Sequence, residues 1–263
     1  IWFNITKPKI DKRLLPKLRL SKNKFCSPVK KKVSLLNKDT FSFLNKSQLF
    51  SKIGWDGRQL NISKLWLYNL HYFDDLNATG SVERKVWHNE LLERWVFENK
   101  VGKGVGWESY PTSLRIVNWI KWSFLENTLS NACNQSLVFQ ASWINKRIEW
   151  HILGNHLFTN AKALVFAGLF FNNEESESWL KKGLKIINDE LDEQILEDGG
   201  NFELSPMYHA IFLEDVLDLI NISKVYSQVI QEAHINKWTK IVKKMISWLD
   251  TMTHSDGDIS FFN

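Results

Sequence analysis

The sequence predicts an all-α fold built from helix hairpins, and three observations favour it. Apolar residues recur at helical spacing from about residue 58 onward. About eight such segments follow one another, mostly through short links. Glycine-flanked polar clusters lie between them, as in an (α/α) toroid, whose inter-helix loops gather polar and aromatic residues on one face. A bundle or a solenoid is also compatible with helix pairs, although no fixed-period repeat supports a solenoid. We therefore expect an incomplete (α/α) toroid.

Residues 1–54 differ from the rest and predict a basic N-terminal arm that is irregular or partly β. Residues 1–40 hold twelve of the 34 basic and two of the 29 acidic residues, which leaves 22 basic and 27 acidic residues in the remainder. Such an arm can bind nucleic acid, anionic lipid or acidic glycan, but it is more often a solvated segment. No basic stripe with interleaved aromatics continues into residues 55–263, the expected helical domain, so we expect no nucleic-acid partner.

Each expected helix has its own signals. Pro111 follows the glycine-rich loop 102–111 and suits a first helical turn. The segment 174–195 begins with acidic residues, which helix N-termini prefer. The apolar periodicity predicts helices over 64–76, 82–99, 112–127, 136–153, 155–171, 174–195, 207–222 and 232–252.

The sequence gives limited information on the compartment of the protein and on its association with membranes. Cys26 and Cys133 match neither a metal spacing nor a disulfide framework. No apolar run reaches the roughly 18 residues that span a bilayer, so we expect no stable membrane insertion. The sequence begins with Ile1, which leaves localisation open: periplasmic or secreted if an upstream signal peptide exists, otherwise cytoplasmic. Most of the 13 tryptophans are expected to pack between helices, and some to line a cleft.

The stretch GNHLFTN gathers polar residues at a helix start. Asn155 and His156 follow Gly154, where asparagine is also a good N-cap. His156 and Asn160 lie at i and i+4 and share a helical face. An amide and an imidazole on one face can bind a carboxylate or a sugar hydroxyl.

Other catalytic patterns are less well supported. His151 and His156 are five residues apart, unlike the i, i+4 pair of HExxH. A zinc site that also takes His209 and Glu203 remains an open alternative, but we expect no metal and no cofactor. Ser205 lacks the GxSxG elbow of a serine nucleophile, and no phosphate-binding loop is present.

The stretch GGNFELSPMYH places ionisable groups on both sides of a helix-starting Ser-Pro. Glu203 precedes that pair, and Tyr208 and His209 follow it. A surface turn requires only the glycines and the proline. A tyrosine near a histidine can serve as a general acid or base, although a packed aromatic is the other interpretation of Tyr208.

Five ordered motifs resemble the heparinase II/III-like family. They are WLYNLHYFDDL, GWESYPTSLRIVNWIKW, EWHILGNHLFTNAKALVFAGLFF, LEDGGNFELSPMYHAIFLEDVLDL and HSDGDISFFN. They are similar to the N-terminal helical domain of that family and cover about residues 55–263. The resemblance implies a polysaccharide lyase, of the kind known from bacteria, that cleaves uronic-acid-containing glycans by β-elimination. It also implies an (α/α) toroid followed by a β-sandwich.

The resemblance also implies residue roles. Tyr208 looks like the catalytic tyrosine of the family, and Asn155 like the asparagine that neutralises the substrate carboxylate, with His156 nearby. Orienting or subsite roles are implied for Glu203, His209 and Arg115. Tyr72 and Trp107 are expected to stack on sugar rings, and Asn160, from its spacing to His156, is expected to contact substrate. Relatives continue beyond HSDGDISFFN into the β-sandwich, which usually contributes a histidine, so this chain alone is expected to bind acidic polysaccharide weakly and to turn it over very slowly or not at all.

Two alternatives from other classes remain open. The first is a non-catalytic module that binds acidic glycan, and the second is a structural helical domain whose basic arm docks a membrane or a partner. A lyase creates an unsaturated uronate that absorbs ultraviolet light, a binder does not, and a structural protein shows neither binding nor turnover. The sequence leaves open the polysaccharide (heparan sulfate, alginate, chondroitin or a bacterial capsule or O-antigen sugar), the general base and the oligomeric state.

Overall fold

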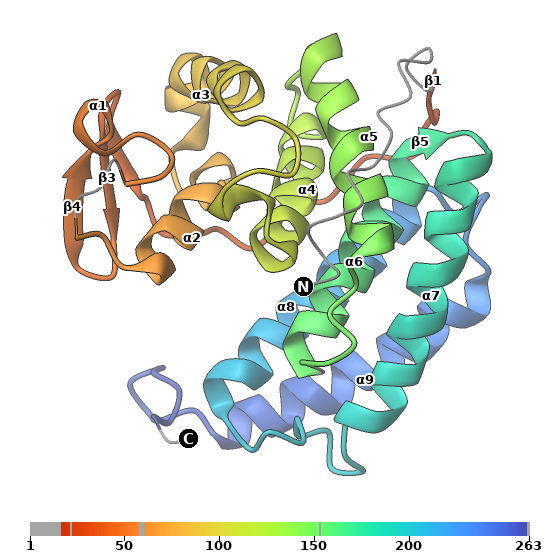
Figure 1. Ribbon diagram of the computed structural model, residues 1–263. Coiled ribbons are helices and arrows are strands. Elements are labelled where there is room, and N and C mark those ends of the chain that lie inside the picture. The colour runs from red at the N-terminus through yellow and green to blue at the C-terminus, as the bar shows by residue number, and fades with distance from the viewer. Residues whose placement is uncertain (1–16, 22, 58–60, 153, 262–263) are drawn as a thin grey trace. The chain divides into compact units, whose positions relative to one another are not determined.

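The structure is a computed structural model that describes residues 17–21, 23–57, 61–152 and 154–261 (Figure 1). The described chain falls into two compact units. Pro28–Ile148 form the first, and Lys17–Ser27 together with residues 149–261 form the second. The expected boundary between residues 54 and 55 stays a prediction, and residues 1–16 of the expected arm lie outside the described residues.

The first unit begins with a small antiparallel sheet, so the N-terminal segment is partly β as expected. Its strands have the order β2-β3-β4, and a short helix follows: β2 Leu35–Asn37, β3 Thr40–Phe43, β4 Lys46–Leu49 and α1 Phe50–Ile53. Asp75, which is buried, accepts hydrogen bonds from the backbone N–H groups of Ser34 and Leu35 at 2.8 and 3.0 Å. The Arg84 side chain donates to the same carboxylate at 2.8 Å. This carboxylate therefore fastens the sheet to the helices of the unit.

The helices of the first unit differ in their bounds from the expected ranges. The helix expected over 64–76 ends at Tyr72, because Phe73 takes a left-handed conformation with φ of 63°. The helix expected over 136–153 runs instead over 131–146, because the Ser130 side chain caps it by accepting from the Cys133 N–H. The helices are α2 Lys64–Tyr72, α3 Lys85–Glu98, α4 Ser109–Ser123 and α5 Asn131–Lys146, with 3₁₀ turns η2 Asp74–Asn77, η3 Ser81–Arg84 and η4 Val105–Trp107.

The second unit consists of two antiparallel helix hairpins and a two-residue strand pair. Figure 1 shows α6 beside α7 and α8 beside α9. The α6–α7 hairpin is tight because glycines lie at the contacts: a Cβ on Gly183 would lie 2.8 Å from the Ala161 carbonyl oxygen. The elements are β1 Lys17–Leu18, α6 Gly154–Phe170, β5 Phe171–Asn172, α7 Glu174–Gln194, α8 Pro206–Val225 and α9 Glu232–Thr251, with β1 paired to β5.

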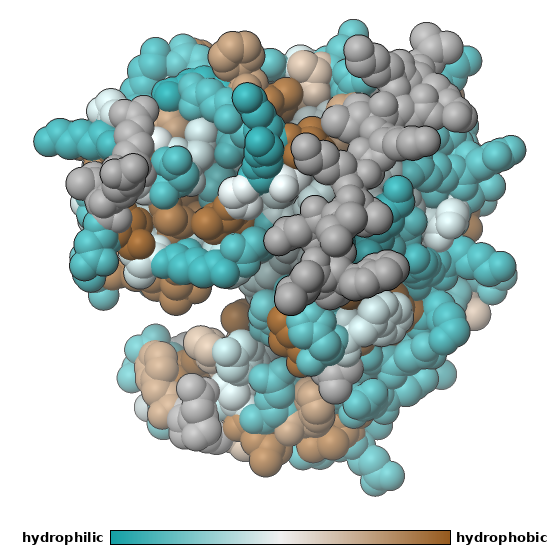
Figure 2. All heavy atoms as spheres, viewed as in Figure 1, coloured by the Kyte–Doolittle hydropathy of each residue, from teal (hydrophilic) through white to brown (hydrophobic). Residues whose placement is uncertain are grey.

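The surface of α7 agrees with its sequence pattern. Its first turn carries three acidic residues, and a capping box at Asn173 and Ser176 starts the helix. In Figure 2 the face that lies over α7 is mostly hydrophilic, as expected of an amphipathic helix. Among the described helices none is both long and apolar enough to cross a membrane.

We expect Gly168→Ala to lower the free energy of unfolding by about 1–3 kcal/mol. The added Cβ would lie 2.7 Å from the Leu180 Cβ, the Leu180 backbone nitrogen and the Ser176 carbonyl oxygen. Two of these atoms belong to the backbone of α7, so the hairpin must open to admit the methyl group. Urea unfolding followed by circular dichroism measures the change. Ser178→Ala, at an exposed position of α7, is the control, and equal stability of the two variants would contradict the close approach.

Candidate functional site

Helices α6 and α8 run parallel to one another, which brings their N-terminal ends together. The rings of Phe158 and Phe212 have centroids 4.1 Å apart. Further along, the Lys162 Nζ lies 2.7 Å from the Asp215 Oδ1 and 2.7 Å from the Asp218 Oδ2. In both contacts a residue of α6 meets a residue of α8 about 54 positions later. The spacing stays nearly constant along the two helices only if they run in the same direction.

This register sets Asn155 and Tyr208 at the same level of the two helices. They are 53 positions apart, and both lie in first turns, where α6 begins at Gly154 and α8 at Pro206. Both side chains are half-buried. Within the described chain neither side chain forms a hydrogen bond, so the amide and the hydroxyl are available to a ligand.

The two helix termini at this end favour a negatively charged group, although the Glu203 and Glu149 carboxylates also lie close by. The N-terminus of an α-helix carries partial positive charge and unpaired N–H groups. Because α6 and α8 are parallel, both helices direct that end toward the level of Asn155 and Tyr208. A carboxylate bound there would be stabilised by both helix termini.

The glycines of the GGNFELSPMYH stretch let the loop before α8 pass close over α9. Gly199 has φ of 93°, and a Cβ there would lie 2.5 Å from the Lys244 carbonyl carbon. A Cβ on Gly200 would lie 2.7 Å from the Trp248 Nε1. Pro206 then opens α8 as its first residue. The loop is therefore held against α9, and it delivers Tyr208 in the first turn of α8.

His209 anchors this loop rather than facing a ligand. Its Nδ1 accepts from the Asn201 N–H at 3.2 Å, so its Nε2 carries the proton and donates to the Met245 carbonyl at 3.0 Å. The ring packs on Trp248 with centroids 4.4 Å apart and is fully buried. Burial lowers the pKa of His209, which favours this neutral form. The implied contact of His209 with substrate is therefore replaced by a positioning role.

Glu203 lies beside the start of α6. A Cβ on Gly154 would be 3.0 Å from the Glu203 Oε1. The Glu203 side chain is exposed, and its backbone N–H donates to the Asn201 Oδ1 at 2.9 Å. This places a carboxylate next to the residue that precedes Asn155, where a polar contact with a ligand is possible.

His156 and Asn160 share a face as expected, and both point to Glu149, which sequence reasoning missed. The Asn160 Oδ1 accepts from the Glu149 N–H at 2.9 Å, and its Nδ2 donates to the Glu149 Oε2 at 3.1 Å. The His156 Nδ1 lies 3.3 Å from the same Oε2. Asn160 is fully buried, so it holds Glu149 and does not reach a sugar. His156 is half-buried and remains beside Asn155.

Three of the candidate substrate residues belong to the first unit, and all are buried there. Arg115 is fully buried, donates to the Gln140 Oε1 at 3.0 Å and covers the Trp95 ring at 3.8 Å. Trp107 packs against Trp95, with ring centroids 5.6 Å apart. These contacts make Arg115 and Trp107 core residues of the first unit, rather than side chains that touch a glycan.

Tyr72 is similarly placed, but its neighbours reach the surface. Its ring lies 6.4 Å from that of Tyr68 and 5.9 Å from that of Tyr110. Tyr68 is half-buried and donates to the Glu108 carboxylate, which also pairs with Lys64 at 2.8 Å. Burial first, and then this hydrogen bond, raise the pKa of Tyr68 to about 12. Tyr68 is thus the more accessible aromatic, and the sequence did not single it out.

No group of three or more His, Cys, Asp or Glu side chains in the described chain could hold a metal ion. Both ring nitrogens of His209 already bond to backbone groups. His209 therefore cannot complete the zinc site that the sequence left open.

Residues 100–263, more than half of the chain, match the family described as Heparinase II/III N-terminus. The chain belongs to this family. Two heparin-sulfate lyases are similar in sequence. That of Bacteroides stercoris is 32% identical over 104 residues, and that of Pedobacter heparinus is 28% identical over 110 residues. The family resemblance of the motifs is thereby confirmed.

Solved structures show the same fold. A heparan sulfate lyase of Pedobacter heparinus superposes with a TM-score of 0.57 at 21% identity, over 85% of this chain and 38% of that one. A heparinase III gives 0.57 at 20% identity, over 84% and 36%. The expected all-α, toroid-like class of helix hairpins is confirmed.

The sequence matches cover 39% and 41% of this chain, but only 15% and 16% of the two relatives. The chain thus corresponds to a minor part of the proteins it resembles. What those proteins do as a whole applies to this chain only as a proposal.

Proposed function

We propose that this chain is the helical part of a polysaccharide lyase, which cleaves a uronic-acid-containing polysaccharide by β-elimination. The observation that carries the proposal is that Asn155 and Tyr208 lie in the first turns of α6 and α8, two helices that run parallel. Membership of the heparinase II/III family and the two heparin-sulfate lyase relatives support it. Heparan sulfate or a similar uronate polymer is the substrate class that these relatives favour.

The chemistry requires two things from the protein. The C5 proton of a uronate is poorly acidic beside an ionised carboxylate, so the charge that develops on that carboxylate must be stabilised. The Asn155 amide donates a hydrogen bond there, and the positive ends of the two helices add to the effect. This stabilisation grows as the enolate forms, which lowers the barrier rather than only tightening binding.

The Tyr208 hydroxyl serves the proton transfers. A base takes the C5 proton. The electron pair of the C5–H bond forms the C4–C5 double bond, and the bond between C4 and the glycosidic oxygen breaks. The leaving glycosidic oxygen then receives a proton, which the Tyr208 hydroxyl donates. Half-burial and a hydroxyl without a hydrogen-bond partner in the described chain suit this role. His156 lies beside Asn155 and contacts the uronate carboxylate of the substrate, as Asn155 does.

The remaining candidates divide by exposure. Glu203 is exposed beside Gly154 and contacts substrate. His209 and Asn160 are buried and hold the loop before α8 and Glu149 in place. Arg115, Trp107 and Tyr72 support the first unit through its core. Catalysis depends on such supporting residues because a displacement of about 1 Å can cost roughly 10²-fold in rate.

The test is to incubate the chain with heparan sulfate, chondroitin sulfate and alginate and to follow ultraviolet absorbance of the unsaturated uronate, together with direct binding. We expect absorbance to rise with at least one polymer. Asn155→Asp should abolish the rise, because a carboxylate there repels the uronate, whereas the control Asn131→Asp, at an exposed position of α5, should not. Binding without absorbance at high protein concentration would favour a glycan-binding module, and absence of both would refute the proposal.

A further inference from the structure

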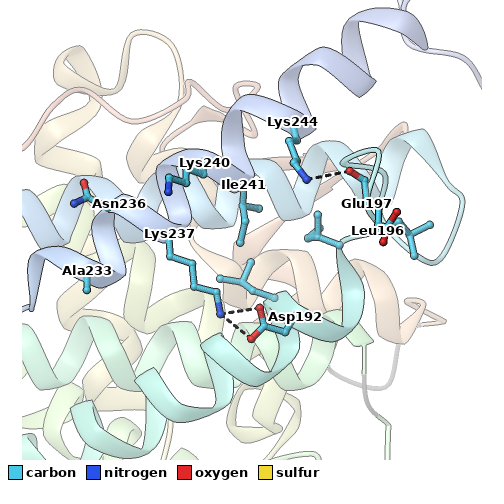
Figure 3. Close-up of a pocket in the computed structure, with 11 residues that line it drawn as sticks. Asp192, Leu196, Glu197, Ala233, Asn236, Lys237, Lys240, Ile241 and Lys244 are labelled. Carbon is cyan, nitrogen blue, oxygen red and sulfur yellow. Dashed lines mark hydrogen bonds and ion pairs between the residues drawn. The ribbon is translucent and has the colours of Figure 1, made fainter.

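The second unit contains a cavity that the catalytic proposal does not use. It lies between the end of α7 and one face of α9 and has a volume of about 570 Å³ (Figure 3). Its wall is partly apolar, with Ile241 at its centre. Lysines and acids surround this wall. The lining consists of Leu191, Asp192, Ile195, Leu196, Glu197, Ala233, Asn236, Lys237, Lys240, Ile241 and Lys244.

The three lysines form a row on one face of α9. Lys237, Lys240 and Lys244 follow the i, i+3, i+7 spacing of a single helical face, and Figure 3 shows all three along the cavity. Seven residues of helix span about 10 Å, a length over which more than one sugar unit of an extended chain lies. The row therefore suits a linear ligand rather than a single small ion.

Most of this positive charge is not neutralised. Lys240 forms no ion pair with a described residue, and it is exposed. Lys244 donates to the Glu197 backbone carbonyl at 3.0 Å and forms no ion pair with a described carboxylate. Only Lys237 has an acidic partner, Asp192, at 2.7 Å.

The charge of α9 stands out against the rest of residues 41–263. Between Glu232 and Asp250 the helix carries four lysines and no acidic residue. The chain from residue 41 onward holds more acidic than basic residues, 27 against 22. Glu197 also lines the cavity, but the three lysines outnumber it and Asp192. This face of α9 therefore attracts a polyanion more strongly than residues 41–263 do on average.

The lysine row leads toward the candidate catalytic end of the same unit. Lys244 lies directly under Gly199, at the start of the loop that carries Tyr208. The next residue, Met245, accepts the hydrogen bond from His209, the neighbour of Tyr208. One polymer can thus follow α9 and continue to the loop before α8.

We propose that this cavity is a second glycan-binding site, which holds anionic sugar units of a polysaccharide chain outside the catalytic residues. The lysines bind carboxylate or sulfate groups, and the apolar wall takes the C–H faces of the rings. The site anchors a long polymer while another part of it reaches Tyr208. The inference rests on the proposed function for the identity of the polymer, but not for the binding itself.

The experiment compares two double variants with the same loss of charge. Lys240→Gln/Lys244→Gln removes two cavity lysines, and Gln at 244 can still donate to the Glu197 carbonyl. Lys181→Gln/Lys243→Gln is the control, because both residues are exposed and neither lines the cavity. Affinity for long-chain heparan sulfate and for its tetrasaccharide is measured at several salt concentrations, with neutral dextran as the uncharged probe.

We expect the cavity variant to bind the long chain roughly tenfold more weakly, with a shallower salt dependence because fewer counterions are released on binding. Any turnover of the tetrasaccharide should remain unchanged, because the cavity lies outside the catalytic residues, and the control should keep wild-type affinity for the long chain. Equal weakening by both variants, or none in the cavity variant, would overturn the proposal. Affinity is measured directly and does not depend on turnover. If the chain proves not to be a lyase, the comparison of the two double variants therefore still tests the binding site.

Discussion

Tyr208→Phe is expected to lower polysaccharide turnover by about 10²–10⁴-fold, the usual contribution of a positioned general acid or base. The change removes one hydroxyl and keeps the ring. That hydroxyl forms no hydrogen bond within the described chain, so folding should be unaffected. Initial rates of ultraviolet absorbance measure the effect, and the thermal midpoint verifies that the variant is folded.

Tyr226→Phe provides the matched control at the opposite end of α8. Tyr226 is buried and directly follows the last residue of that helix, so its hydroxyl is far along the helix from Tyr208. The control should retain turnover per folded molecule. A Tyr208→Phe rate within about threefold of wild type would mean that another group transfers the proton.

The helical architecture could be predicted because its signal is local. Apolar periodicity located each long helix, and the acidic start of α7 and Pro206 of α8 marked beginnings that the structure retains. The bounds of α5 were wrong because Ser130 caps the helix ahead of the apolar segment, and because residues 147–149 are irregular and 150–152 form a turn. A cap is one side-chain hydrogen bond, which periodicity does not report.

The candidate site could be predicted only in part, since sequence shows residue types but not which polar atoms the fold satisfies. Asn155 and Tyr208 have available polar groups. The side chains of Asn160 and His209 instead form hydrogen bonds with Glu149 and with backbone groups, respectively. Glu149 itself lacks any motif. Its role depends on a turn that brings it back to Asn160, eleven residues later.

Lys162→Met is expected to lower the free energy of unfolding by about 3–5 kcal/mol, because it leaves two buried carboxylates without their cation. Lys162 is almost fully buried and bonds to both Asp215 and Asp218 at 2.7 Å. Burial raises the pKa of Asp215, and Lys162 opposes that shift. Urea unfolding measures the loss, and Lys185→Met, which removes an exposed pair with Asp189, should cost less than about 1 kcal/mol.

The pH dependence of stability and a rescue variant test whether unpaired carboxylates cause the destabilisation by Lys162→Met. Without Lys162, burial keeps the pKa of Asp215 above its value in the unfolded chain. The folded variant therefore binds this proton more tightly than the unfolded chain does. Its loss of stability relative to wild type should be smallest at low pH and should grow as pH rises through the carboxyl pKa. Replacing the whole cluster, as Lys162→Met/Asp215→Leu/Asp218→Leu, should restore most of the stability, because no charge remains buried. A single variant whose deficit is independent of pH, or a triple variant no more stable than the single one, would show that lost packing rather than the unpaired carboxylates destabilises the α6–α8 pair.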